Sequence, residues 1–129
     1  MMEVSQLFSL RGHNVVALNQ EGTFLHKKSF DTYGDPSAGA KLDAFIKALP
    51  RNTIVLVSVH DSGNAYVSSE AQGALRSIYA ADPIIPSYRG SWALIGYKGS
   101  PRPSWIRQAY NQKGLGPTVI SASIPLYGK

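Results

Sequence analysis

The sequence predicts an α+β domain in which two mainly antiparallel β-sheets pack as a sandwich, with two or three short flanking helices. Apolar runs rich in β-branched residues lie both before and after two segments with helical periodicity. A turn sequence, Asn19-Gln20-Glu21-Gly22, separates the first two strand-like runs and indicates a hairpin. The length of 129 residues predicts one domain over 1–129, with 1–10 as a first strand or a lead-in.

The first half of the chain alternates strand and helix signals. Residues 14–18 and 23–30 form the arms of the predicted hairpin. A helix is predicted over 37–49, where Leu42, Phe45, Ile46 and Leu49 make one apolar stripe. The run 53–59 (TIVLVSV) predicts a central strand that is buried on both faces.

The second half begins with a helix predicted to start near Ser69, where Ser69 and Gln72 fit a capping box. Ala71, Ala74, Leu75 and Ile78 give this helix a narrow apolar face, and a proline-containing connector follows. We further expect a strand over 92–95, a short helical or turn piece over 105–110, and a final strand over 118–124.

Composition excludes several kinds of function. With no cysteine, disulfides and cysteine-ligated metals are ruled out. The net charge of +5 is spread along the chain without a dense basic block, so nucleic-acid binding is not favoured. No run of 18 apolar residues predicts a membrane span, and residues 1–10 lack the pattern of a signal peptide. We therefore expect synthesis in the cytoplasm and no membrane association.

The sequence does not predict an enzyme, a metal site or a cofactor. His13, His26 and His60 lack metal-ligand spacing, and we expect them in turns or on the surface. His60 and Asp61 are the one adjacent pair suited to acid–base chemistry, but neighbouring side chains on an extended backbone point apart. A turn stabilised by Asp61 is the simpler interpretation.

A recognition site is predicted where the central strand ends and the Trp92 strand begins. If these two strands are neighbours, their end loops converge and bring Asp61 and Arg89 to one rim. A carboxylate and a guanidinium together supply acceptors and donors for sugar hydroxyls, and Tyr88 or Tyr66 can offer an aromatic face. An ordinary structural ion pair is the alternative.

Four runs in order resemble a known family: RGHNVVALN (11–19), SFDTY (29–33), TIVLV (53–57) and YRGSWALIGYKG (88–99). They are similar to the interleukin-like EMT inducer (ILEI/PANDER) domain superfamily. That superfamily includes the carbohydrate-binding stem domain of protein O-mannose β-1,2-N-acetylglucosaminyltransferase, the kind of member that this chain resembles most. The resemblance covers roughly residues 11–126.

This resemblance implies a compact fold of two antiparallel sheets without enzymatic activity. It also implies a carbohydrate-binding module for a glycan such as an N-acetylglucosamine-containing saccharide. The ligand contacts of the stem domain are matched here by Asp61 and Arg89, and we expect His60, Tyr88 and Gly90 to complete the site. The absence of cysteines favours a bacterial or phage member, acting outside cells or on a virion surface, for example in a phage tail.

Two other functions are open. A protein-interaction or structural module, either cytokine-like or part of a larger assembly, fits the scattered charge and the proline-rich segment 100–104 with an exposed Trp105. A small glycoside hydrolase needs a pair of carboxylates, for which Asp31, Asp35 and Asp61 are the loop candidates. The hydrolase has the least support.

Overall fold

The computed structural model describes residues 2–4, 11–59, 64–86, 89–112 and 118–125. Its strands are β1 (Met2–Val4), β2 (His13–Leu18), β3 (Phe24–Phe30), β4 (Thr53–Val59), β5 (Ser91–Lys98), β6 (Arg107–Asn111) and β7 (Ile120–Ala122). Its helices are α1 (Ala38–Ala48) and α2 (Ser69–Ser77).

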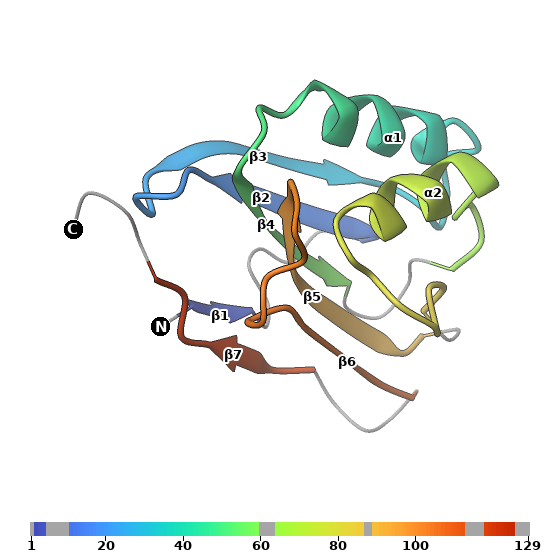
Figure 1. The fold of residues 1–129 in the computed structure, drawn as a ribbon. Helices are drawn as coiled ribbons and strands as arrows, with labels where there is room; N and C mark the ends of the chain where they lie inside the picture. The colour runs from blue at the N-terminus through green and yellow to red at the C-terminus, as the bar shows by residue number, and fades with distance from the viewer. Residues whose placement is uncertain (1, 5–10, 60–63, 87–88, 113–117, 126–129) are drawn as a thin grey trace.

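The main layer is a five-stranded sheet in the order β3-β2-β4-β5-β6, with every neighbouring pair antiparallel (Figure 1). The predicted hairpin is its β2–β3 pair. A second sheet contains the two short strands β1 and β7. The α+β class with mainly antiparallel strands is therefore confirmed. A two-sheet sandwich is not confirmed, because the second sheet consists of only two strands of three residues each in the described part of the chain.

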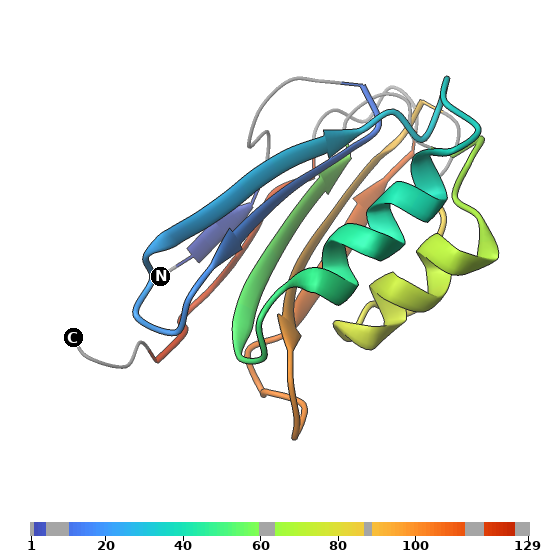
Figure 2. The ribbon, with the colours of Figure 1, turned by 90° about the horizontal axis from the view of Figure 1, so that it is seen from above.

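Both helices lie on the same face of the five-stranded sheet (Figure 2). The stripe predicted for α1 packs inward, with Leu42, Ile46 and Leu49 buried and Phe45 partly buried. The predicted face of α2 is buried as well. The β1–β7 pair lies on the opposite face of the main sheet, as both ribbon views show.

The centre of the core is β4, whose seven residues are all buried. Val55, Val57 and Val59 share the helix-covered face, while Ile54 and Leu56 point to the other face. The prediction of a strand buried on both faces is thus confirmed. On the adjacent β5, a Cβ at Gly96 would lie 2.6 Å from the carbonyl oxygen of Ile78. This glycine therefore allows the chain after α2 to approach the sheet closely.

Lys98 joins the helical layer to the sheet. Its Nζ donates hydrogen bonds to the carbonyls of Ile46 (2.7 Å) and Leu49 (2.6 Å), and also to that of Lys47. These carbonyls lie at the C-terminus of α1, where the last carbonyls of a helix are not all satisfied by intrahelical hydrogen bonds. Burial lowers the pKa of Lys98.

Two details of the predicted elements are wrong. The segment expected to be helical or a turn over 105–110 instead contains strand β6, which pairs with β5. The N-cap of α2 is Ser68, whose Oγ accepts a hydrogen bond from the backbone N–H of Ala71. Gln72 donates from its Nε2 to the carbonyl of Val67 and does not accept from the backbone N–H of the N-cap, so the expected capping box of Ser69 and Gln72 is not formed.

Neither α1 nor α2, the helices of the described ranges, has the length and apolar character needed to cross a bilayer.

Candidate functional site

The predicted recognition site lies at one end of the main sheet, which we call the loop edge. Here β2 and β5 begin and β3, β4 and β6 end. Val59 is paired with both His13 and Trp92, so β4 and β5 are neighbours as the prediction required. The connections that follow β4 and precede β5 therefore both start from this edge.

Of the predicted site residues, the structure describes Arg89 and Gly90. Arg89 is exposed, whereas Gly90 is buried, and Trp92 beyond them is completely buried. Arg89 has a φ of 56°, an uncommon value for a residue with a side chain and one that is enriched at functional sites.

His60, Asp61 and Tyr88 lie outside the described residues. The contact between Asp61 and Arg89, on which the saccharide hypothesis depends, therefore stays a prediction. Tyr66, the other aromatic residue considered for the site, is 38% exposed. Its backbone N–H donates to the carbonyl of Thr32 at 2.7 Å, which places Tyr66 beside the loop that leaves β3.

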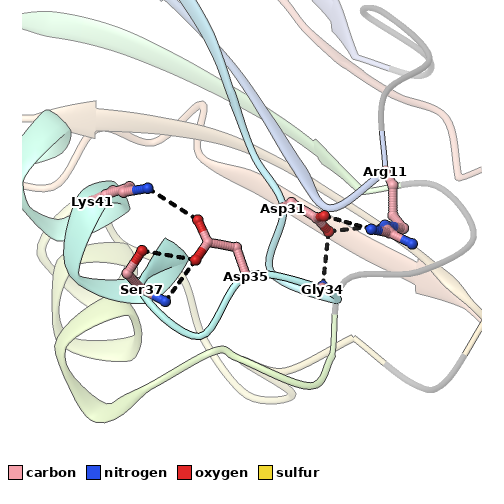
Figure 3. Close-up of polar contacts among 6 residues, drawn as sticks. All are labelled: Arg11, Asp31, Gly34, Asp35, Ser37 and Lys41. Atoms are coloured by element: carbon pink, nitrogen blue, oxygen red, sulfur yellow. Dashed lines mark hydrogen bonds and ion pairs between the residues drawn. The ribbon is translucent and has the colours of Figure 1, made fainter.

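A second charged group at the loop edge, the Arg11 cluster, consists of Arg11, Asp31 and Tyr33, of which Figure 3 shows Arg11 and Asp31. Nε and Nη2 of Arg11 donate to the two oxygens of Asp31 at 2.9 and 2.6 Å. Asp31 also accepts from the backbone N–H of Gly34 at 2.9 Å. The guanidinium lies 5.3 Å from the ring centre of Tyr33, within the range of a cation–π contact.

The Arg11 cluster is rigid but accessible, because the Arg11 side chain is 55% exposed while its bidentate bond fixes its direction. The hydrogen bond from Arg11 is the main reason that the pKa of Asp31 is lowered. The sequence patterns did not predict a binding site at these residues. The predicted hairpin is the feature of the sequence that could have revealed the cluster. Arg11 precedes the first arm of the hairpin and Asp31 follows the second, so both residues lie at the open end of the hairpin.

Asp35, next to the Arg11 cluster, stabilises the start of α1 (Figure 3). Its Oδ1 accepts from the hydroxyl and the backbone N–H of Ser37, and its Oδ2 accepts from Lys41 at 3.1 Å. The hydrogen bonds from Ser37, with help from Lys41, lower the pKa of Asp35 to about 2.

These two carboxylates are unsuited to the hydrolase chemistry considered above. A glycosidase needs a general acid whose pKa is raised, so that it holds a proton near neutral pH. The pKa values of Asp31 and Asp35 are both lowered, and their oxygens are already engaged. The third candidate, Asp61, lies outside the described residues.

His13 was expected in a turn or on the surface, and this expectation is wrong. It is the first residue of β2, completely buried on the helix-covered face. Nδ1 lies 2.7 Å from the Thr32 hydroxyl, and the ring centre is 6.1 Å from that of Trp92. Its Nε2 has no hydrogen-bond partner among the described residues. Desolvation lowers the pKa of His13 to about 4. A metal is not indicated here, since no group of three ligand-type side chains occurs in the described part of the chain.

Comparison with known proteins gives a family and several relatives. Residues 11–100 match the protein family described as Interleukin-like EMT inducer. The mouse cell migration-inducing and hyaluronan-binding protein is 29% identical over 83 residues, covering 64% of this chain and 6% of that protein. Human protein FAM3C is 31% identical over 90 residues, covering 69% of this chain and 39% of that protein. The chain thus spans less than half the length of these relatives.

Proposed function

Because the chain belongs to the interleukin-like EMT inducer family, we propose that it is a non-catalytic recognition domain that binds another protein through its loop edge. The observation that carries this proposal is the Arg11 cluster, a fixed and exposed guanidinium stacked on Tyr33. Arginine and tyrosine are enriched among the residues that dominate binding energy at protein interfaces. The domain acts outside cells in this proposal. The bacterial or phage origin and the virion location stay predictions.

The electrostatics of the Arg11 cluster suit this role. Asp31 neutralises most of the guanidinium charge and fixes its position, so a partner does not have to order a flexible side chain. Tyr33 adds flat apolar area beside it, and the half-exposed Tyr66 lies next to the same loop. Recognition at such a surface depends on shape and stacking more than on net charge.

The test begins with capture of partners from the native source on the immobilised domain, followed by titration of the purified partner. We expect Arg11→Ala to weaken the measured Kd at least tenfold, about 1.4 kcal/mol. Arg76→Ala is the matched control, because Arg76 is also an exposed arginine (48%) bound to an aspartate, Asp82, but on α2. Equal losses for the two variants, or an unchanged Kd for Arg11→Ala, would contradict the proposal.

Glycan binding is the second candidate, and the neighbouring positions of β4 and β5 favour it. Arg89 is exposed directly before β5, and one relative is named as a hyaluronan-binding protein, hyaluronan being a saccharide. In this candidate Asp61 and Arg89, with His60, Tyr88 and Gly90 around them, hold an N-acetylglucosamine-containing saccharide. A shallow, wet site recovers little free energy, so we expect a Kd of about 0.1–1 mM.

A titration of N-acetylglucosamine oligosaccharides followed by NMR tests this candidate. We expect amide shifts confined to the loop edge and abolished by Arg89→Ala. Shifts that persist in this variant would reject the Asp61–Arg89 site. The two candidates also separate in the protein experiment, because removal of the partner's glycans leaves binding intact only if the partner's polypeptide is recognised.

A further inference from the structure

A hollow lies at the other end of the main sheet, far from the loop edge. Its walls come from the β2–β3 turn, the start of β4, the end of β5, the β5–β6 connection and the segment after β7. We call it the Trp105 pocket; its key residues are Gln20, Asn52, Tyr97, Arg102, Trp105 and Ile124. Its volume is about 380 Å³, within the range of small-molecule sites.

The apolar part of the Trp105 pocket contains two aromatic rings. Trp105 was expected to be exposed, but it is half-buried and packs edge to face against Tyr97, with ring centres 5.5 Å apart. Ile54 on β4 and Ile124 in the segment after β7 add aliphatic surface. The pocket is thus built on the core and not on the loops alone, so it is present before any ligand binds.

The polar part of the pocket is held by a short chain of hydrogen bonds. Gln20 Nε2 donates to the Tyr97 hydroxyl at 3.3 Å, and this hydroxyl donates to Asn52 Oδ1 at 2.7 Å. Since the oxygen of the Asn52 amide is engaged, its Nδ2 group remains as a donor. The network therefore fixes the position of Asn52 and leaves it able to donate to a ligand.

Arg102 is exposed at this pocket and forms no hydrogen bond or ion pair with any described residue. Each of the other described arginines has a partner: Asp31 for Arg11, Ser100 for Arg51, Asp82 for Arg76, two carbonyls for Arg107, and a further contact for Arg89. An unpartnered guanidinium beside a hollow is a ready binding group for an anion.

The unused side-chain groups of the pocket are mainly donors. Besides the guanidinium of Arg102 and Asn52 Nδ2, the indole N–H of Trp105 donates to no described residue. Among the described residues that line the pocket there is no aspartate or glutamate. A ligand that satisfies these groups must be rich in acceptors, and it must present a flat apolar face to the aromatic rings.

We propose that the Trp105 pocket binds a small ring compound carrying a carboxylate, with the ring against Trp105 and the carboxylate on Arg102. Aromatic acids and uronic acids both have this chemistry, and the experiment distinguishes them. The site is independent of the proposed function, because the Arg11 cluster lies at the opposite end of the sheet.

The test is an NMR titration of the whole chain with benzoate and with glucuronate, each beside its uncharged counterpart, benzamide or glucose. We expect saturable shifts of the Trp105 indole N–H and the Asn52 side-chain amide with at least one acid, and at least tenfold weaker binding of its counterpart. A response to benzoate identifies an aromatic acid, and a response to glucuronate identifies a uronic acid.

Variants complete the test. Arg102→Gln should weaken acid binding at least tenfold, and Arg102→Lys should weaken it less because the charge is kept. Arg76→Gln on α2 and Arg11→Gln at the loop edge remove the same charge elsewhere and should leave binding unchanged. The proposal is overturned if neither acid shifts the pocket resonances, if neutral compounds bind as well, or if Arg102→Gln and Arg76→Gln behave alike.

Discussion

At the scale of single residues, His13 shows how burial changes chemistry. It lies at the loop edge, next to the proposed binding surface, but its ring is completely buried beneath Thr32 and beside Trp92. A buried imidazole without a carboxylate partner favours its neutral form. A histidine expected from the sequence in a turn or on the surface is therefore a structural element of the core.

This burial predicts a pH dependence of stability. The pKa of His13 is lowered from 6.5 to about 4, so the unfolded chain binds more protons than the folded one between these values. The free energy of unfolding should therefore have its full value above pH 6.5 and fall by about 3 kcal/mol as the pH drops to 4. Urea unfolding of the parent and of His13→Gln, across this range, measures the effect.

In His13→Gln the slope between pH 6.5 and 4 should vanish, whatever the variant's stability at pH 7. His26→Gln, which makes the same change at an exposed histidine on β3, is the comparison variant. The carboxylates affect the free energy of unfolding over a different pH range. The lowered pKa values of Asp31 and Asp35 stabilise the fold above their unfolded value of 3.8, and this contribution is lost below it. A slope that survives in His13→Gln would show that other groups cause it.

At the scale of elements, two glycines have opposite roles. Gly73 lies on the exposed side of α2, and a Cβ added there meets no atom within 4 Å. Gly73→Ala should raise the free energy of unfolding by roughly 0.5–1 kcal/mol, because glycine is the poorer helix former. Gly96→Ala, the same chemical change on β5, should lower it by roughly 1–3 kcal/mol, because the methyl group meets the Ile78 carbonyl. Thermal unfolding of both variants shows whether each change stabilises or destabilises the protein. A more stable Gly96→Ala variant would contradict the close packing of Gly96 against the Ile78 carbonyl.

Local patterns predicted most elements correctly, since periodicity reports which face an element buries. The strand 53–59 is found with the predicted bounds, and α1 spans Ala38–Ala48 where a helix over 37–49 was expected. β5 is longer than predicted, and β7 is shorter. β6 could not be predicted from its own residues, because its conformation depends on pairing with β5.

The candidate site was predictable only in part. The site hypothesis depended on β4 and β5 being neighbours, which their pairing shows, and Arg89 is exposed directly before β5. The pairing of Arg11 with Asp31 joins residues that are twenty positions apart, and it requires the register of the hairpin. The Trp105 pocket requires five separate segments to meet, which no local pattern reports.

At the scale of the whole molecule, β3 and β6 are the outer strands of the five-stranded sheet. An outer strand offers unpaired backbone groups to other chains, and charged side chains discourage such pairing. Lys27 and Lys28 on β3 and Arg107 on β6 are exposed in these positions. Charge is therefore placed where self-association through the sheet would begin.

Replacing both lysines of β3, in Lys27→Val with Lys28→Val, should promote self-association through this strand. Valine favours extended structure, and the change removes two charges from the edge. Sedimentation velocity at increasing protein concentration should show a larger mass than for the parent. The control, Lys41→Ala with Lys47→Ala, removes the same charge from α1. Should the β3 variant sediment as the control does, edge charge would not be the protective factor.

The pairing of β1 with β7 has a consequence for how this unit can be combined with others. Met2 lies opposite Ala122 and Val4 opposite Ile120, in antiparallel register. The chain therefore enters β1 and leaves β7 at neighbouring positions, where paired Cα atoms are only about 5 Å apart. A domain whose strands β1 and β7 are paired in this way can be inserted into a surface loop of a larger protein without separating the strands that flank that loop.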